Sequence, residues 1–506
     1  MRLENLVLKN YRKKSIDMKL LLFIPLALLI TTNTVLAQSG NITESLYDTY
    51  EQYKEPTLRK RRVKHYEIQS LISKHAANKA FTIRKVGESI EGRALNLVSI
   101  GSGKTNVLLW SQMHGDEPTA TQGIFDIFNF MVSDDFKAEK KEILDNLTVH
   151  FLPMLNPDGA ERFQRRNLLG VDINRDALRL QSPESKTLKY VRDSLNADFG
   201  FNLHDQSTYY NAELTEKPAT ISYLAPAFNY EKDISEKRGN AMKIIVFMNN
   251  IIQKYAPGQV GRYNDDFEPR AFGDNIQKWG TSTILIESGG YANDIEKQEI
   301  RKLNYVSILS AIYTIAKENY KEISIDDYEK IPENDRKLFN LKITNATYNL
   351  LGKNYVLDLG INRLEVDKEG NNDFWYSSRI IDQGDLSTYY GYETFDATGY
   401  EVKQGKIYPN VVTNISDLKG LNVIDILKQG CAYVRVANIS NETLVSPFPL
   451  NVLGSKTELP DFQLKVGNNP TFILEKKGVP KYAVINGFLI DLESGKGDFE
   501  NAMIYR

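Results

Sequence analysis

Residues 110–117, WSQMHGDE, decide what the rest of the chain is expected to build. The apolar run NVLLW at 106–110 predicts a buried strand, and the polar HGDE follows directly after its end. In open α/β sheets, sites form beyond the carboxyl ends of the strands. His114 and Glu117 offer a nitrogen and an oxygen donor there, as a metal site requires. Taken alone the pair is weak evidence, because a polar turn after a strand is ordinary loop chemistry.

A catalytic zinc takes three protein ligands and keeps a fourth position open for water. The chain contains five His residues, so few can supply the third ligand. His204, in FNLHDQ, ends another short apolar run and is the candidate. His150 lies inside the apolar run LTVHFLPML (147–155), where a satisfied core histidine is the better interpretation.

Glu287 stands at the end of a further apolar run, in TSTILIESGG (281–290), and precedes two glycines. A carboxylate beside a metal is well placed to act as a general base on water. By itself, Glu287 could equally cap a strand or a turn.

Residues 156–176, NPDGAERFQRRNLLGVDINRD, bring together Arg165, Arg166 and Arg175. The guanidinium fork grips a carboxylate with two hydrogen bonds, so arginines near a metal suit a substrate that carries a carboxylate. The alternative is a solvated basic surface.

Together these clusters resemble the zinc carboxypeptidase family, over roughly residues 60–320. The family's order of motifs is present as His-x-x-Glu, Asn-Pro-Asp-Gly, Gly-Val-Asp-x-Asn-Arg, a distant His and a late Glu, at 114–117, 156–159, 170–175, 204 and 287. The resemblance implies an α/β fold with a mixed, mostly parallel central sheet and helices on both faces.

The resemblance also implies roles for individual residues. One Zn²⁺ per chain would be held by His114, Glu117 and His204, and Asp172 would orient the ring of His114. Glu287 would be the general base that takes a proton from metal-activated water. The implied activity is that of a metallocarboxypeptidase, the hydrolysis of C-terminal amino acids from peptides.

On the substrate side, the resemblance implies that Asn174 and Arg175 bind the terminal carboxylate. Arg166 would polarise the scissile carbonyl and stabilise the oxyanion, with Arg165 as the alternative. The family's mobile active-site Tyr has no clean match here. Phe272 falls near its place, as a substrate-binding candidate, and Tyr263 is the nearest Tyr.

Two other functions stay open. The first is a murein-peptide amidase or carboxypeptidase that acts on cell-wall stem peptides, which are also amides beside a free carboxylate. The second is a catalytically dead protein that binds peptides or glycans through the same cleft. The intact ligand set and Glu287 argue against the second.

The N-terminus predicts a signal peptide over residues 1–37. An apolar run at 20–30 follows basic residues, and Val35-Leu36-Ala37 offers a cleavage site. Met18 is an alternative start, and an uncleaved anchor is the alternative to a signal. We therefore expect a secreted or periplasmic protein, with no membrane contact after cleavage and no activation segment. The single Cys, Cys431, excludes an internal disulfide framework.

The remaining features concern organisation and partners. The formal net charge of −2 gives no reason to expect a nucleic-acid partner, and we expect a monomer that binds peptides. We predict a catalytic domain at 40–320, a charged linker at 321–336 and a β-rich accessory domain at 337–506 with one short helix near 421–430. The end of the chain resembles the small β domain that flanks amidohydrolase barrels. The alternative is a generic β-sandwich.

Overall fold

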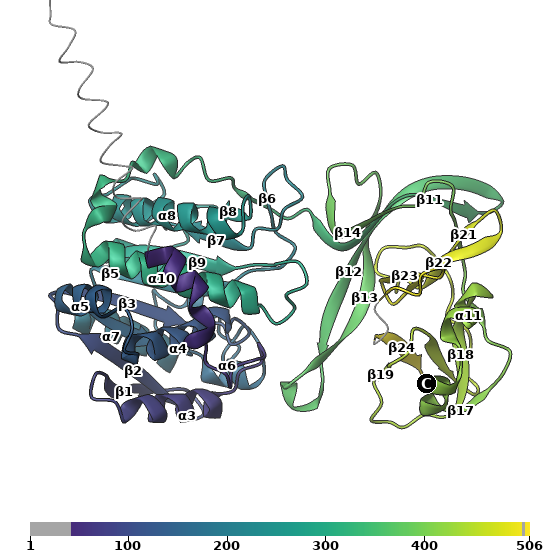
Figure 1. Cartoon of the computed structure of the whole chain (residues 1–506), viewed down its shortest axis with the longest axis horizontal. Helices are drawn as coiled ribbons and strands as arrows, with labels where there is room; N and C mark the ends of the chain where they lie inside the picture. The colour runs from purple at the N-terminus through teal and green to yellow at the C-terminus, as the bar shows by residue number, and fades with distance from the viewer. Residues whose placement is uncertain (1–41, 498–500) are drawn as a thin grey trace, which may run out of the picture.

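The computed structural model describes residues 42–497 and 501–506, and the predicted signal peptide lies outside these ranges. Two parts lie side by side along the long axis (Figure 1). An α/β part comes first in the chain, and a β-rich region begins at Leu338. In the described ranges, no helix combines the length and apolar character needed to cross a membrane.

The α/β part is built on an eight-stranded sheet. Its strands, in spatial order, are β1 (Thr82–Glu88), β2 (Ala94–Gly101), β4 (Leu147–Leu152), β3 (Thr105–Ser111), β5 (Phe199–Asp205), β9 (Ser282–Ser288), β7 (Ile221–Leu224) and β8 (Val260–Arg262). The four central strands run parallel, while β1, β2 and β7 each pair antiparallel with a neighbour. The predicted mixed, mostly parallel sheet is therefore confirmed.

Helices cover both faces of this sheet, as predicted (Figure 1). Side chains alternate along a strand, so Val107 and Leu109 of β3 face one core while Leu108 and Trp110 face the other. The first core, here called the α10 face, contains α3 (His65–Ala76), α4 (Thr119–Val132), α5 (Lys137–Asn146), α8 (Glu236–Tyr255) and α10 (Gln298–Ala316). The second core, the α9 face, contains η2 (Ile173–Arg175), α7 (Pro183–Leu195) and α9 (Phe272–Lys278).

The carboxyl ends of β3, β5 and β9 meet at one edge of the sheet, because these strands are parallel neighbours. His114 lies in the turn after β3, and Glu117 lies just before α4. His204 and Glu287 are opposite one another on β5 and β9. The three apolar runs that predicted buried strands thus place the candidate residues at a common edge.

The β-rich region contains two sheets. The first has β13 (Phe374–Gly384), β12 (Lys353–Asp367), β11 (Leu338–Leu350), β15 (Glu401–Lys403), β21 (Phe472–Lys476), β22 (Val479–Ile485) and β23 (Phe488–Asp491), with β14 (Tyr390–Asp396) on β11. The second has β16 (Lys406–Ile407), β18 (Cys431–Asn438), β20 (Asn451–Gly454), β24 (Ala502–Tyr505) and β19 (Val445–Ser446), with β17 (Val412–Asn414) on β18. The predicted short helix is α11 (Val423–Lys428), so both the β-rich pattern and the helix are confirmed.

Residues 321–336, predicted to be a linker, pack against the α/β part instead of running free. The side chain of Tyr328 is fully buried, and its hydroxyl accepts a hydrogen bond from the backbone of Ala225. Ile331 joins the same core. The sequence analysis did not single out the apolar residues that anchor this segment, because charged residues surround them. The segment then forms β10 (Asn334–Asp335), which pairs with β6 (Asn211–Ala212) of the loop after β5.

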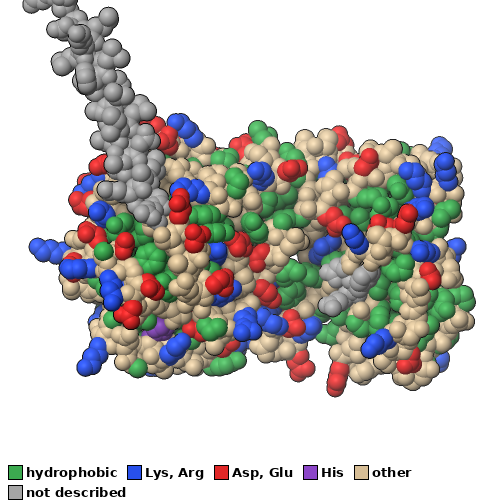
Figure 2. Space-filling model, viewed as in Figure 1, with side chains coloured by type: hydrophobic (Ala, Val, Ile, Leu, Met, Phe, Trp, Pro, Cys, Tyr) green, Lys and Arg blue, Asp and Glu red, His purple; other side chains and the backbone are tan. Residues whose placement is uncertain are grey.

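Polar contacts join the two parts. Arg61 and Arg62, which precede α3, form ion pairs with Glu365 of β12, and Arg62 also pairs with Asp367. On the other side of the junction, the Tyr392 hydroxyl donates to the carbonyl of Thr208 at 2.6 Å. Acidic and basic side chains are accordingly mixed along the seam between the parts (Figure 2).

The α10 face holds a fully buried ion pair whose loss we expect to destabilise the fold. Arg301 of α10 donates to both carboxylate oxygens of Asp126 on α4, at 2.7 and 2.5 Å. Arg301→Met would leave Asp126 buried without its partner, which costs about 3–5 kcal/mol of unfolding free energy. Urea denaturation followed by circular dichroism measures this loss.

The matched control is Lys141→Met, which breaks an exposed pair with Asp145 on α5. We expect no appreciable change in the urea midpoint there, because exposed pairs contribute little. Equal losses in the two variants would contradict the role given to the buried pair.

Candidate metal centre

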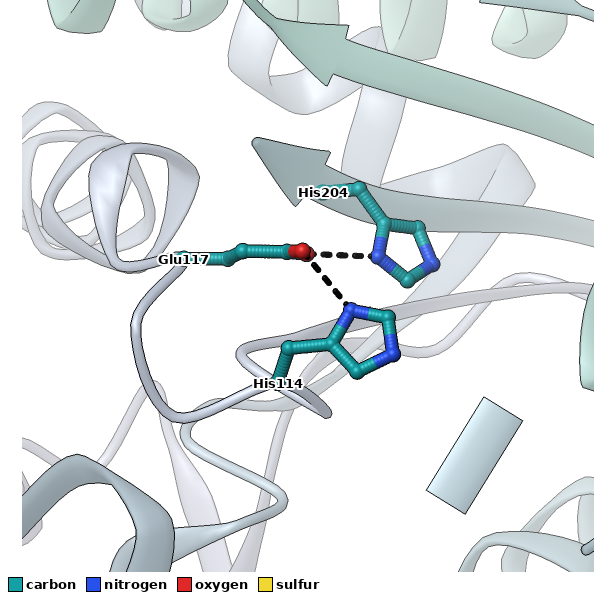
Figure 3. Close-up of side chains that lie close together, drawn as sticks. All are labelled: His114, Glu117 and His204. Carbon is teal, nitrogen blue, oxygen red and sulfur yellow. Dashed lines mark hydrogen bonds and ion pairs between the residues drawn. The ribbon is translucent and has the colours of Figure 1, made fainter. Parts of the chain in front are cut away.

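Three buried side chains from two strand ends converge at the carboxyl edge of the sheet. His114 Nδ1 lies 2.8 Å from one carboxylate oxygen of Glu117, and His204 Nδ1 lies 2.7 Å from the other (Figure 3). One ligand atom from each residue lies within 4.8 Å of the others. Two imidazole nitrogens and a carboxylate are the donors that zinc binds in catalytic sites, so the residues present fit a zinc ion.

Electrostatics favour positive charge on His114, whereas burial lowers the pKa of His204. Burial opposes the charged form of His114, but the charge of Glu117 and the hydrogen bonds to Asp172 and Glu117 outweigh it and raise the pKa of His114 to about 9. Burial also works against ionised Glu117, yet the two histidines hold its pKa well below the usual range. A ring nitrogen and a carboxylate oxygen at 2.7–2.8 Å repel one another unless a proton or a metal lies between them.

Asp172 lies where the resemblance implied. It precedes η2, accepts a hydrogen bond from the backbone of Asn174, and contacts His114 Nε2 at 3.1 Å. This contact turns Nδ1 of the ring toward Glu117. Burial raises the pKa of Asp172, but His114 and Arg165 outweigh it and hold the pKa well below its ordinary value.

Glu287 is a half-buried carboxylate beside this group. It lies opposite His204 across the β5–β9 pair, and its Oε2 atom has no hydrogen-bond partner among the described residues. Burial, and then the negative charge of Glu117, raise the pKa of Glu287 well above its ordinary value. A carboxylate with a raised pKa and an unoccupied oxygen can accept a proton from a reacting group.

The structure brings Arg165, and not Arg166, to the centre. Arg165 Nη1 lies 3.1 Å from His114 Nδ1 and 3.3 Å from Glu117, and its Nε donates to Asp172 at 3.1 Å. Arg166 is exposed and donates to the carbonyl of Gly170. The geometry thus favours Arg165, the alternative in the sequence analysis, and the role of either arginine toward substrate stays a prediction.

The substrate-side residues lie on the α9 face. The Asn174 side chain accepts a hydrogen bond from the backbone of Phe272 at 2.9 Å. Arg175 reaches the surface, where its Nε lies 3.5 Å from Glu268. Phe272 itself is fully buried and packs edge-on against Trp279. The start of α9 thus belongs to the core, and the contact of Phe272 with substrate stays a prediction.

A pair of tyrosines lies near Glu287 instead. The hydroxyl groups of Tyr263 and Tyr210 are 3.4 Å apart. Burial, and next the charge of Glu287, raise the pKa of Tyr263. The sequence analysis noted Tyr263 but missed Tyr210, although a Tyr-Tyr pair so soon after His204 was an available signal.

A buried ion pair behind the ligands was also missed. Asp205, which follows His204, accepts from Lys297 Nζ at 3.0 Å and from the Thr119 hydroxyl at 2.5 Å. Lys297 also donates to the carbonyl of Ser288 at 2.9 Å. One ammonium group thereby ties together the ends of β5 and β9, the strands that carry His204 and Glu287.

Comparison with known proteins agrees with this geometry. Residues 68–223 match the family model of the zinc carboxypeptidases. Over this range the chain is similar to that family. The matched range contains His114, Glu117 and His204, whereas Glu287 lies beyond it.

Individual relatives are distant. The chain is 28% identical to carboxypeptidase SOL1 of Arabidopsis thaliana over 135 residues, which are 23% of this chain and 27% of the relative. It is 30% identical to carboxypeptidase E of Caenorhabditis elegans over 116 residues, 19% of this chain and 25% of the relative. The chain thus spans about a quarter of the length of these curated relatives.

Among solved structures, the metallo-carboxypeptidase from Burkholderia cenocepacia is 16% identical, with a TM-score of 0.41 over 50% of this chain and 68% of that one. Carboxypeptidase A from Helicoverpa armigera is 15% identical, with a TM-score of 0.40 over 56% and 80%.

Zinc binding to the metal-free protein should release a proton. The pKa of His114 near 9 means that its ring is protonated at pH 7.5, and zinc requires the neutral ring. We expect about one proton released at pH 7.5 and an apparent affinity that rises about tenfold per pH unit up to about pH 9. Titration calorimetry in buffers of different ionisation enthalpy measures the release.

Asp172→Asn is the comparison variant for this titration. It removes one of the contacts that raise the pKa of His114, so less proton release and weaker binding are expected. Heats that do not depend on the buffer in the unmodified protein would refute the linkage.

Proposed function

We propose that this protein is a zinc-dependent carboxypeptidase that releases C-terminal amino acids from peptides. The observation that carries the proposal is the half-buried carboxylate of Glu287 directly opposite His204, with a buried Oε2 atom that has no hydrogen-bond partner among the described residues. A protein that only bound peptides would gain nothing from a carboxylate with a raised pKa at that point.

His114, Glu117 and His204 would hold a zinc ion, which would supply a Lewis acid that makes water nucleophilic near neutral pH. Glu287 accepts the proton of the attacking water and later returns it to the departing amine. Asp172 keeps the ring of His114 in the orientation that ligation needs. The reaction is a direct hydrolysis in which no side chain becomes acylated.

Arginines on two sides hold the substrate. Arg165, which lies against the ligand group, donates hydrogen bonds to the carbonyl oxygen as it gains negative charge. Arg175 and Asn174 bind the terminal carboxylate on the α9 face. The Arg175 guanidinium lies near the carboxylate of Glu268. The terminal carboxylate of the substrate would therefore replace Glu268 as the partner of Arg175.

Glu287→Gln is the central test of the proposal. We expect the variant to bind zinc as the unmodified protein does and to lose about 10²–10⁴-fold in kcat on blocked dipeptides, because the amide cannot accept a proton. Removal of zinc with a chelator should abolish activity, and added zinc should restore it. Zinc content is measured by atomic absorption on the same samples.

The substrate panel also separates the alternatives. Cleavage of cell-wall stem peptides alone would move the substrate to the wall while keeping the mechanism. Zinc binding with no cleavage of any member of the panel would count against an enzyme and favour the peptide-binding function.

The two neighbouring arginines form a matched pair of tests. Arg165→Ala should lower kcat by about 10²–10³-fold, which is the usual loss when one oxyanion donor is removed. Arg166→Ala should leave kcat near its original value, because its guanidinium bonds to Gly170 at the surface. Steady-state kinetics on one blocked dipeptide compares them, and the reverse order of losses would return the oxyanion role to Arg166.

A further inference from the structure

A cavity of about 560 Å³ lies between the α/β part and the β-rich region. Its volume falls in the range of about 300–1,000 Å³ that ligand sites occupy. Both parts line it: Thr208 and the loop Gly290–Ile295 from one, and Tyr376, Tyr392 and Glu393 from the other. Gly290 is required here, since the Tyr392 hydroxyl lies 2.0 Å from where a Cβ would stand.

The cavity adjoins the metal centre. Thr208 follows His204 by four residues, and Gly290 follows Glu287 by three. Lys297 also lines the cavity, and its ammonium group bonds Asp205, whose backbone N–H donates to the ligand Glu117 at 3.3 Å. One wall of the cavity is therefore in direct contact with the residues that support the metal ligands.

The cavity and the proposed carboxylate site lie on opposite faces of the sheet. Arg175 follows Ile173, which packs in the core of the α9 face. Lys297 immediately precedes α10, which packs on the other face. The metal ligands stand at the strand ends between them. A peptide with its terminal carboxylate at Arg175 and its last amide bond at the metal therefore extends, with its preceding residues, toward the cavity.

The walls suit an uncharged peptide backbone. Five of the six charged side chains of the walls form ion pairs, Arg61 with Glu365, Arg363 with Glu393 and Lys297 with Asp205. The sixth, Asp294, accepts hydrogen bonds from the backbone N–H groups at the start of α10. The loop Gly290–Ile295 contributes backbone, and Tyr291, Tyr376 and Tyr392 contribute rings with hydroxyl groups. Such walls offer hydrogen bonds and flat apolar surface without favouring either sign of charge.

We propose that this cavity binds the residues that precede the scissile bond, so that the β-rich region forms one wall of the substrate site and the preferred substrates are peptides longer than dipeptides. The inference rests on the proposed function, which it deepens. The β-rich region, which contributes no residue to the metal centre, would then help to select the length of the substrate.

The test compares blocked peptides of two, four and six residues that share one C-terminal residue. The unmodified protein should cleave the longer peptides with kcat/KM at least about tenfold higher, mostly through KM. Ala292→Trp fills the cavity from an exposed position of the wall, without removing a side-chain contact. It should abolish the advantage of length and leave dipeptide cleavage unchanged. Ala138→Trp, on the exposed side of α5, is the matched control and should behave as the unmodified protein does.

A binding series keeps the inference testable apart from catalysis. Calorimetry with the zinc-loaded Glu287→Gln protein measures the dissociation constant of the dipeptide and the hexapeptide, with and without Ala292→Trp. If the hexapeptide binds more tightly and Ala292→Trp removes this difference, the result supports the cavity even when no peptide is cleaved. The absence of cleavage would contradict only the proposed function. Cleavage and binding that do not depend on length, or a length advantage that survives Ala292→Trp, overturns the inference while hydrolysis of the dipeptide stands.

Discussion

The centre of this molecule depends on one buried carboxylate, Glu117, held between the rings of His114 and His204. An anion with these two bases at 2.7–2.8 Å is stable inside a protein only when a cation or protons balance it. The surrounding groups affect this balance of charge. Asp172 strengthens the positive charge on one side, and Arg165 limits it on the other. The chemistry of these groups therefore fits a bound metal ion.

The parallel sheet makes this arrangement possible. His204 and Glu287 are opposite each other because β5 and β9 run in the same direction with matched ends. Lys297 then bonds to groups at both ends and limits their relative movement. A shift of one residue between these strands would turn Glu287 to the other face of the sheet and remove it from His204.

The sequence predicted what depends on local pattern. His114, His204 and Glu287 each end or follow an apolar run, so their positions at the edge of the sheet follow from strand direction. The place of Asp172, which precedes η2, followed from the resemblance alone. The choice between Arg165 and Arg166 depends on side-chain direction in an irregular loop, which no periodicity encodes. The burial of Phe272 was not predicted for a related reason, since it is decided by how α9 packs. Contacts such as Arg61 with Glu365 join residues about 300 positions apart and leave no local trace.

The junction between the two parts adds a constraint on what can enter the site. His204 and Glu287 lie at the ends of β5 and β9, and the loops that follow these strands touch the β-rich region a few residues later. The hydrogen bond from Tyr392 to Thr208 therefore holds the loop that follows β5. The β-rich region is thus in contact with the loops next to His204 and Glu287. The β-rich region contains no His. It can thus affect which substrates fit through its contacts with the loops that follow β5 and β9.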